Sequence, residues 1–216
     1  HVRVTLRIAL AEAQRDGLVA QNVAALAKAP PVKNNEMRTL DADGVRKLIA
    51  VVSDTDGAAF WLTAITTGMR AGELAGLQWD DVDLDGGVLH VRRSWARGLD
   101  GGFGVKEPKT DKSKRTVPLT PEVVDALRLL HQRMEADGPV ADADPVFTDA
   151  AGQRIDISKL APRLRVLLAK AGLPTDVRFH DLRHTAATLW LAAGVDVKTV
   201  ADLLGHSTAV TTMNVY

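Results

Sequence analysis

The last 37 residues of the chain carry side chains that could bind and attack a phosphate. His180 and Arg183 are three residues apart at the expected start of a helix, so they share one face of it. Helix N-termini favour anions because their first backbone N–H groups are unpaired. His206 follows Gly205, and Tyr216 is the only tyrosine in the chain. Each residue alone most often has a structural role, so the hypothesis of a phosphate site depends on their joint occurrence.

Two stretches upstream could supply what such a site still lacks. Arg70 lies in a break between two expected helices with a glycine on either side, and Glu73 follows at a spacing that puts it on the same side. Taken alone, the two are typical of a surface ion pair. Lys109 lies on an expected basic hairpin, where a lysine could contact a phosphate as a point charge or act as a general acid. Such a run is otherwise typical of a solvated loop.

Hydrophobic spacing predicts the elements that position these residues: a mainly α fold with a small antiparallel β-sheet, α+β in class. An apolar helix is expected over residues 57–67, ending at Gly68. Residues expected to begin helices are capping residues or precede a proline: Asp41, Thr120, Ser158, Asp181 and Asp196. The extended segments expected are 87–92, 105–109 and 115–119, with a short strand at 145–148.

The chain is expected to contain two units. Residues 1–29 read as helices too short to form a core alone, so we expect residues 1–31 to be the C-terminal helices of a truncated domain. Pro30 and Pro31 break the helical pattern, and residues 32–38 are expected to be a linker. Residues 39–216 are expected to form the second unit.

Composition excludes several classes of site. The 216 residues include no cysteine, which rules out disulfides, thiolate metal sites and a cysteine nucleophile. No apolar run approaches about 18 residues, so no membrane span is expected. The chain has no G-x-x-x-x-G-K motif, and the four aspartates of segment 80–85 fit an acidic turn better than a metal site. We therefore expect no metal and no cofactor.

Charge is balanced overall but segregated along the chain. Net charge is zero, which alone argues mildly against nucleic-acid binding. Segment 106–115 holds five basic residues against two acidic ones, whereas segment 135–149 holds five acids and no base. If the two signs are also separated in space, they would orient the protein on a polyanion.

The candidate residues also occur in the order of a known family. Arg70 with Glu73, then Lys109, His180-x-x-Arg183, Leu204-Gly205-His206-Ser207 and Tyr216 closely resemble the catalytic domain of tyrosine recombinases, the phage integrase family. The sequences around these residues match the family as well: Thr-Gly-Met-Arg-Ala-Gly-Glu-Leu, Arg-Thr-Val-Pro-Leu and His-Asp-Leu-Arg-His-Thr. The resemblance covers Thr39 to Tyr216, and residues 1–29 resemble the last helices of the family's core-binding domain. One such motif is weak evidence, but five in this order are specific.

The resemblance implies a site-specific DNA recombinase or integrase that cuts and rejoins strands through a 3′-phosphotyrosyl intermediate, without ATP or metal. Arg70 and Arg183 would contact the phosphate, and Tyr216 would attack it. His180 would accept the tyrosine proton, Lys109 would protonate the leaving 5′ oxygen, and His206 would hydrogen-bond the phosphate. Glu73 would hold the basic groups in place. The remaining basic residues of the hairpin are expected to contact DNA: Lys106, Lys112, Lys114 and Arg115.

The implied partner is double-stranded DNA, with a homotetramer on two synapsed duplexes for the full-length protein. The chain as given is expected to be monomeric, with Tyr216 frayed, and the expected location is the cytoplasm, associated with the nucleoid. Two alternatives stay open at this point. The first is a type IB topoisomerase, which resembles the tyrosine recombinases in its catalytic residues. The sequences Leu-Gly-His-Ser and His-Asp-Leu-Arg-His favour the recombinases. A non-catalytic helical DNA-binding protein could use the same cations as phosphate contacts.

Overall fold

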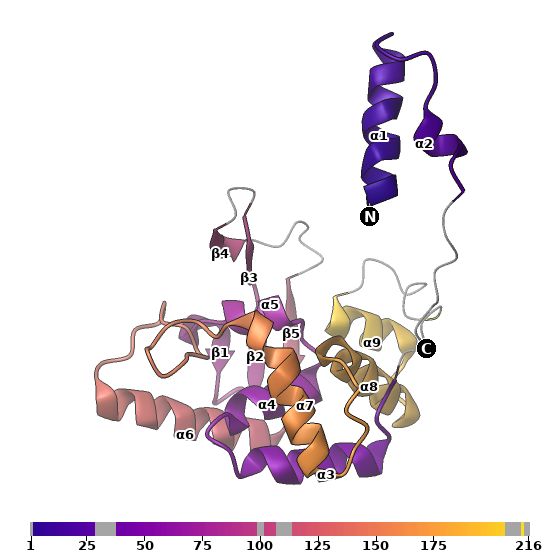
Figure 1. Cartoon of the computed structure of the whole chain (residues 1–216). Coiled ribbons are helices and arrows are strands. Elements are labelled where there is room, and N and C mark those ends of the chain that lie inside the picture. The colour runs from indigo at the N-terminus through magenta and orange to yellow at the C-terminus, as the bar shows by residue number, and fades with distance from the viewer. Residues whose placement is uncertain (1, 29–37, 99–101, 107–113, 206–212, 214–216) are drawn as a thin grey trace. The chain divides into compact units, whose positions relative to one another are not determined.

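The computed structural model describes residues 2–28, 38–98, 102–106, 114–205 and 213 (Figure 1). Its backbone divides into two compact units, residues 1–36 and 37–216. Of the linker predicted at 32–38, only Arg38 is among the described residues.

The first unit is a pair of helices, α1 (Val2–Arg15) and α2 (Val23–Leu26). Asn22 joins them, because its Oδ1 accepts from the N–H of Ala25 at 3.1 Å and its Nδ2 donates to the carbonyl of Arg7 at 2.8 Å. No residue of α1 is buried within the described part of the unit, and Leu6 and Ile8 are exposed. This agrees with the expectation that so short a segment does not form a core.

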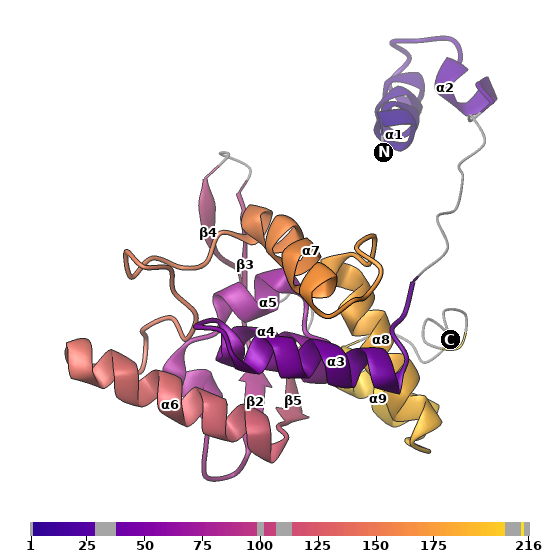
Figure 2. The same ribbon diagram turned by 60° about the horizontal axis from the view of Figure 1, so that its bottom comes forward.

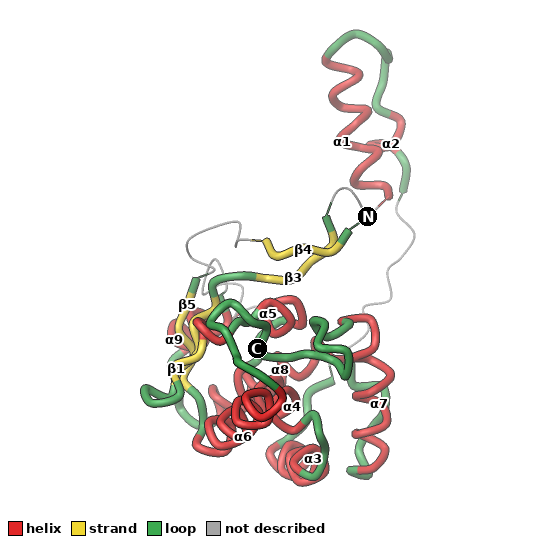
Figure 3. Tube along the Cα trace, turned by 90° about the vertical axis from the view of Figure 1, so that its left-hand side faces the viewer, coloured by secondary structure: helices red, strands yellow, loops and turns green. Residues whose placement is uncertain are grey.

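The second unit is mainly helical with short antiparallel strands, as Figure 3 shows, and this confirms the predicted fold class. Its helices are α3 (Ala42–Ser53), α4 (Ala58–Thr67), α5 (Ala71–Gly76), α6 (Pro121–Asp137), α7 (Leu160–Lys170), α8 (Phe179–Ala192) and α9 (Val197–Leu204). Single 3-10 turns lie at Trp79–Asp81 and Ile157–Lys159. The strands are β1 (Val82–Asp83), β2 (Val88–Val91), β3 (Ser94–Arg97), β4 (Phe103–Lys106) and β5 (Arg115–Pro118). None of the described helices is long and apolar enough to cross a membrane.

Helix α4 is the centre of the core. It contacts α3, α6 and α8, and α3 crosses in front of it in Figure 2. Eight of its ten residues are buried, which is the pattern of a helix apolar on all sides. A smaller apolar cluster, centred on Ala187, Val200 and Leu204, joins α8 to α9. Helix α9 thus shares with α8 an apolar contact area that is separate from the main core.

The strands form two sheets instead of the single one expected. In the first, β2 lies between β1 and β5, with Leu89 opposite Val117 and both buried. In the second, β3 pairs with β4, so that residues 105 and 106 pair with Trp95 and Ser94 and not with the β2–β5 sheet. The strand predicted at 145–148 is also wrong, because this segment contributes only isolated bridges at Pro145 and Thr148.

Several helix ends follow the local capping signals of the sequence. Asp41 accepts from the N–H of Gly44 at 2.8 Å at the start of α3, and Asp196 accepts from the N–H of Thr199 at 2.9 Å at the start of α9. Gly68 ends α4 in a left-handed conformation, as predicted, and Gly205 ends α9 in the same way.

Two predicted helix starts are wrong. The segment before α7 is capped by Asp156, whose Oδ1 accepts from the N–H of Ser158 at 2.9 Å, so Ser158 receives the cap instead of providing it. Asp181 lies in the first turn of α8, and its Oδ2 accepts from the backbone N–H of Arg178 at 2.8 Å. In both cases the residue lies within the turn that an earlier residue begins.

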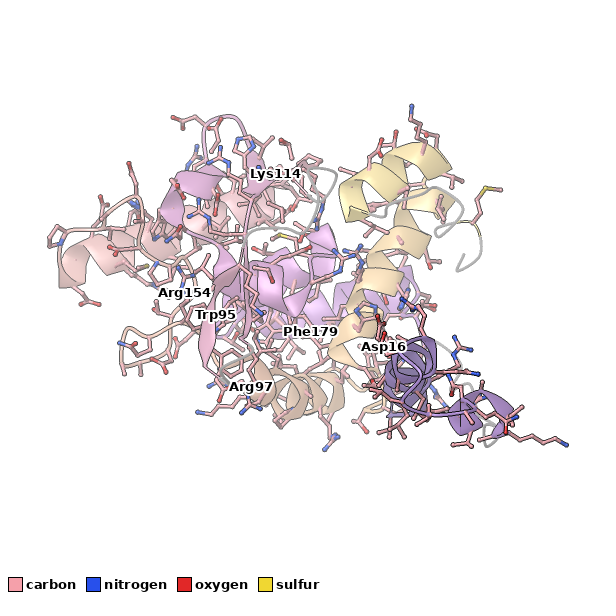
Figure 4. All side chains as sticks on the ribbon, turned by 90° about the horizontal axis from the view of Figure 1, so that it is seen from above. Asp16, Trp95, Arg97, Lys114, Arg154 and Phe179 are labelled. Carbon is pink, nitrogen blue, oxygen red and sulfur yellow. The ribbon has the colours of Figure 1, made fainter. Side chains whose placement is uncertain are left out.

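Helix α5 is held at its C-terminal end and packs closely on β3. Arg154 donates to the carbonyls of Ala75 and Leu77 at 2.9 and 3.3 Å, and its guanidinium lies 5.4 Å from the centre of the Trp95 ring (Figure 4). A Cβ added at Gly76 would come within 2.9 Å of the Cα of Ser94. The glycine therefore allows the strand backbone to approach the helix.

Replacing Gly76 by alanine is expected to destabilise the protein by about 1–3 kcal/mol, because the added methyl overpacks against strand backbone. This loss exceeds the gain of at most about 1 kcal/mol in helix propensity. The urea midpoint of unfolding measures it. Gly104→Ala is the matched control, since a Cβ there meets nothing within 4 Å. Equal midpoints for the two variants would contradict the proposed close approach.

Candidate active site

Arg70 lies at the start of α5, directly after the turn that ends α4. Gly68 turns the chain with φ 60°, and only Met69 separates it from Arg70. Nη1 of Arg70 donates to Oε1 of Glu73 at 2.7 Å, and the backbone N–H of Arg70 donates to Oε2 of Glu73 at 2.9 Å. The Arg70 side chain stays 43% exposed. Glu73 thus fixes both the main chain and the side chain of an arginine that faces the surface.

Glu73 is buried and shared between two arginines. Arg115, the first residue of β5, donates to it from Nη2 to Oε2 at 2.7 Å and from Nη1 to Oε1 at 3.1 Å. Burial by itself would raise the pKa of Glu73, but the hydrogen bonds and charges of Arg115 and Arg70 outweigh it and lower that pKa to about 2. The carboxylate is therefore ionised at neutral pH.

Arg183 extends from α8 to the carbonyl groups of two other segments. It is 3% exposed, and it donates from Nη1 to the carbonyl of Gly68 at 2.9 Å and from Nη2 to the carbonyl of Leu204. Arg115 takes the neighbouring carbonyl of Leu203, from Nε at 2.6 Å. The last carbonyls of a helix lack partners within it and attract cations. The two arginines thus fasten the end of α9 to the α4–α5 turn and to β5.

His180 belongs to the same cluster. Its partial burial, followed by the positive charges of Arg183 and Arg70, lowers the pKa of His180 below its ordinary value. Such charges act only over short distances, because salt screens them beyond about 10 Å. The His180 imidazole is therefore neutral at pH 7 and able to accept a proton. His184 is half-buried and meets the His180 ring edge-on, with 4.9 Å between ring centroids.

The start of α8 is anchored by aromatic and polar contacts. Phe179 lies 6.1 Å from Phe60 and 6.0 Å from Trp61, measured between ring centroids. Thr185 accepts from the backbone N–H of Leu40 at 3.1 Å, which ties the helix to the beginning of the second unit. These contacts fix the turn that carries His180.

Four of the predicted site residues lie outside the described part of the chain: Lys109, Lys112, His206 and Tyr216. Two of the expected DNA contacts are exposed. Lys106 lies on β4, where its Nζ donates to the carbonyl of Arg97 at 2.7 Å, and Lys114 directly precedes β5 (Figure 4). The structure thus brings together Arg70, Glu73, His180 and Arg183.

Arg115 has a different place from the one expected of a DNA contact. Its side chain is only 5% exposed, and its guanidinium binds Glu73 and the end of α9. Sequence reasoning missed this ion pair, because nothing in the spacing of residues 73 and 115 indicates that they meet. The one available signal is that Arg115 begins the sequence Arg-Thr-Val-Pro-Leu, which matches the family pattern.

A cavity of about 700 Å³ lies beside β2 and β5. Its basic lining residues are His90, Arg92, Arg93, Lys114 and Arg115. Most of this charge is already paired: Arg93 lies 3.1 Å from Asp80 and 3.4 Å from Asp81, and Arg92 lies 3.7 Å from Asp81. The first aspartates of the acidic turn therefore neutralise neighbouring arginines. Within the described residues, no group of three or more His, Asp or Glu side chains is placed to hold a metal ion.

The family model described as the phage integrase family matches residues 38–216, which is most of the chain. The chain belongs to the phage integrase family. The order of its motifs had predicted this membership, and the match confirms it.

One similar phage integrase family protein is a tyrosine recombinase XerC-like protein of Caldanaerobacter subterraneus subsp. tengcongensis. It is 34% identical over 197 residues, which is 84% of this chain and 50% of the relative. The chain thus spans about half the length of that protein. The crystal structure of XerA recombinase has 32% identity and a TM-score of 0.66, over 86% of this chain and 60% of that one.

A second solved member is the integrase of transposon Tn1549 in complex with a circular intermediate DNA. Its TM-score is 0.84 at 22% identity, over 99% of this chain and 72% of that one. At this identity the likeness establishes the fold, and it agrees with the mainly α architecture of the second unit.

Proposed function

We propose that this chain is the catalytic part of a site-specific DNA recombinase that cuts and rejoins strands through a 3′-phosphotyrosyl intermediate. The observation that carries the proposal is the convergence of Arg70, His180 and Arg183. Arg70 lies more than 100 residues before α8, the helix that carries both His180 and Arg183, yet Arg183 donates to the carbonyl of Gly68, two residues before Arg70. The charges of both arginines also lower the pKa of His180. Two guanidinium groups beside a neutral imidazole suit an anionic phosphodiester that must be neutralised before a nucleophile can approach it.

In the proposed step, the phenolic oxygen of Tyr216 attacks phosphorus while the bond from phosphorus to the 5′ oxygen breaks. A phenol has a pKa of about 10, so it must give up its proton on attack, and His180 is the proposed acceptor. The depressed pKa of His180 supports this role, because the ring is uncharged when the proton arrives. Lys109 is proposed to protonate the leaving 5′ oxygen.

The remaining roles concern the phosphate and its surroundings. Arg70 and Arg183 are proposed to bind the non-bridging oxygens, and His206 to hydrogen-bond the phosphate. Glu73 is proposed to hold Arg70, which its two hydrogen bonds to that residue support. Because the phosphate ester is retained, another strand's 5′ hydroxyl can rejoin it, and the scheme requires no ATP or metal.

The proposed partner is double-stranded DNA. The structures of the Tn1549 integrase and of lambda integrase on DNA support this, since both share the fold of this chain. We propose Lys106, Lys112 and Lys114 as DNA contacts, a homotetramer on synapsed duplexes as the working assembly, and the nucleoid as its location. Residues 1–31 are proposed to be the last helices of a core-binding domain, joined by a linker at 32–38 to a catalytic domain at 39–216.

A nicked suicide substrate tests the proposed function. With the complete protein encoded by the gene, covalent protein–DNA adduct is expected, and Tyr216→Phe should reduce its rate of formation at least about a thousandfold, because the nucleophile is lost. Denaturing gel electrophoresis measures the adduct, and DNA binding by the variant is the control. Binding without adduct would favour a non-catalytic DNA-binding protein. Relaxation of plasmids that carry no paired site would favour a type IB topoisomerase.

A further inference from the structure

The side chain of Arg115 is buried at the junction of three segments. All three of its guanidinium nitrogens have protein acceptors: Nη1 and Nη2 bind the two oxygens of Glu73, and Nε binds the carbonyl of Leu203. A planar guanidinium is suited to such a double contact with a carboxylate, whereas a lysine is not. Its 5% exposure leaves it little contact with solvent. Every guanidinium nitrogen of Arg115 is thus bonded within the protein.

The two Nη atoms of Arg115 orient Glu73, the carboxylate that holds Arg70. Glu73 uses the same two oxygens for both neighbours, since Oε1 also accepts from the Arg70 side chain and Oε2 from the Arg70 backbone. The orientation of the carboxylate plane is therefore fixed by Arg115, and the orientation of Arg70 follows from it. Without Arg115, the buried carboxyl group would lose its main source of compensating charge.

The other side of this arginine contacts the end of α9. Besides the bond to Leu203, the guanidinium lies against Gly205, where an added Cβ would be 3.1 Å from Nη1. Gly205 directly precedes His206 in the chain. Arg115 also begins β5, so it follows the segment that contains Lys109. One side chain therefore connects the segments that lead to three proposed catalytic residues.

We infer that Arg115 is a positioning residue for strand cleavage, which acts through Glu73 on Arg70 and through the end of α9 on His206. This inference rests on the proposed function. We assign Arg115 no contact with the reacting atoms, because its three guanidinium nitrogens bind Glu73 and the carbonyl of Leu203. Its removal should consequently affect the chemical step more than DNA binding.

Arg115→Met removes the donors and the charge while keeping much of the side-chain length. With the complete protein and the nicked substrate, the rate of adduct formation at saturating DNA is expected to fall about a hundredfold, the effect of a misplaced catalytic group. The DNA concentration for half-saturation should change less than about threefold. Arg115→Lys keeps a charge without the double contact, so its rate should also fall.

The pH profile separates positioning from a general loss of structure. In Arg115→Met, the pKa of the buried Glu73 should rise above its ordinary value of 4.5, so the rate should acquire an additional acidic limb above about pH 5. Arg115→Lys should restore most of the profile but not the rate. In the double variant Glu73→Gln/Arg115→Met the limb should vanish, because glutamine does not titrate, and its rate should be close to that of the slower single variant.

Arg154→Met is the matched control, since Arg154 is also partly buried and donates to backbone carbonyls, but at the other end of α5. It should lower the unfolding midpoint without adding an acidic limb. The inference is overturned if Arg115→Met cleaves DNA with the wild-type rate and pH profile. It is also overturned if the rate loss of the double variant Glu73→Gln/Arg115→Met equals the product of the losses in the two single variants.

A measurement without DNA distinguishes a failure of the positioning role of Arg115 from a failure of the proposed function. The thermal midpoint of wild type should fall as the pH is lowered below about 4.5, because the pKa of folded Glu73 is depressed, and this fall should be smaller in Arg115→Met. Equal pH dependence in both proteins overturns the inference whatever happens with DNA. If the pH dependence differs as expected but the wild-type protein forms no adduct with DNA, the proposed function fails instead.

Discussion

Arg183→Met is expected to lose about 2–4 kcal/mol of unfolding free energy and to cleave DNA at least about a hundredfold more slowly. The loss of stability arises because two carbonyls, of Gly68 and Leu204, would remain without their cationic donor. The loss of rate arises because one of the two proposed phosphate-binding guanidinium groups is removed. Urea unfolding and adduct formation on the nicked substrate measure the two effects.

Arg128→Met is the control for this variant. Arg128 lies on α6 in an exposed ion pair with Asp85, a kind of contact worth at most about 1 kcal/mol. Both its stability and its cleavage rate should stay close to wild type. An Arg183→Met protein as stable as the Arg128→Met control would show that the carbonyl contacts do not hold α9 in place.

The second large effect is expected from Glu73→Gln, and its size should depend on pH. The folded pKa of Glu73, about 2, lies below its ordinary value of 4.5, so the ionised carboxylate stabilises the fold above about pH 4.5. That stabilisation is lost as the pH falls toward 2. The difference of about 2.5 pKa units corresponds to on the order of 3 kcal/mol. Glutamine resembles the protonated acid, so the variant should be less stable by about this amount at pH 7.

Urea unfolding of both proteins at several pH values measures this difference. It should shrink as the pH falls from 4.5 toward 2, because the unfolded wild-type chain then binds a proton at residue 73 that the folded protein does not. Glu135→Gln is the matched control, because Glu135 is an exposed residue of α6 that pairs with His131. Its stability curve should run parallel to that of wild type. A parallel curve for Glu73→Gln would contradict an ionised, doubly paired carboxylate at this position.

The parts of the fold that were predicted correctly depend on local signals. Asp41 and Asp196 cap the helices that follow them, and Gly68 and Gly205 end helices, because each choice involves only a few neighbouring residues. The starts at Ser158 and Asp181 were wrong for the same reason. Each lies close to another residue that can begin the turn, and local sequence does not rank the two.

The strand partners and the Glu73–Arg115 pair were beyond such local reasoning. Segment 105–106 is extended as predicted, but whether it pairs with β3 or with β2 depends on how β3 packs on α5. Similarly, Arg115 reads as one more cation of a basic hairpin until the partner 42 residues away is known. Spacing along α8 predicted that His180 and Arg183 share one face, but only the family resemblance predicted that Arg70 acts beside them.

The bonds that close the candidate site also determine when it can exist during folding. Arg183 bonds to Gly68 across 115 residues, Arg115 to Leu203 across 88, and Leu40 to Thr185 across 145. Contacts between such distant parts form late, because closing long loops costs entropy before the contacts repay it. An intermediate that has folded only α3 to α5 therefore contains Arg70 without its partner arginine. The proposed capacity to break a DNA strand would then arise only together with the completed fold.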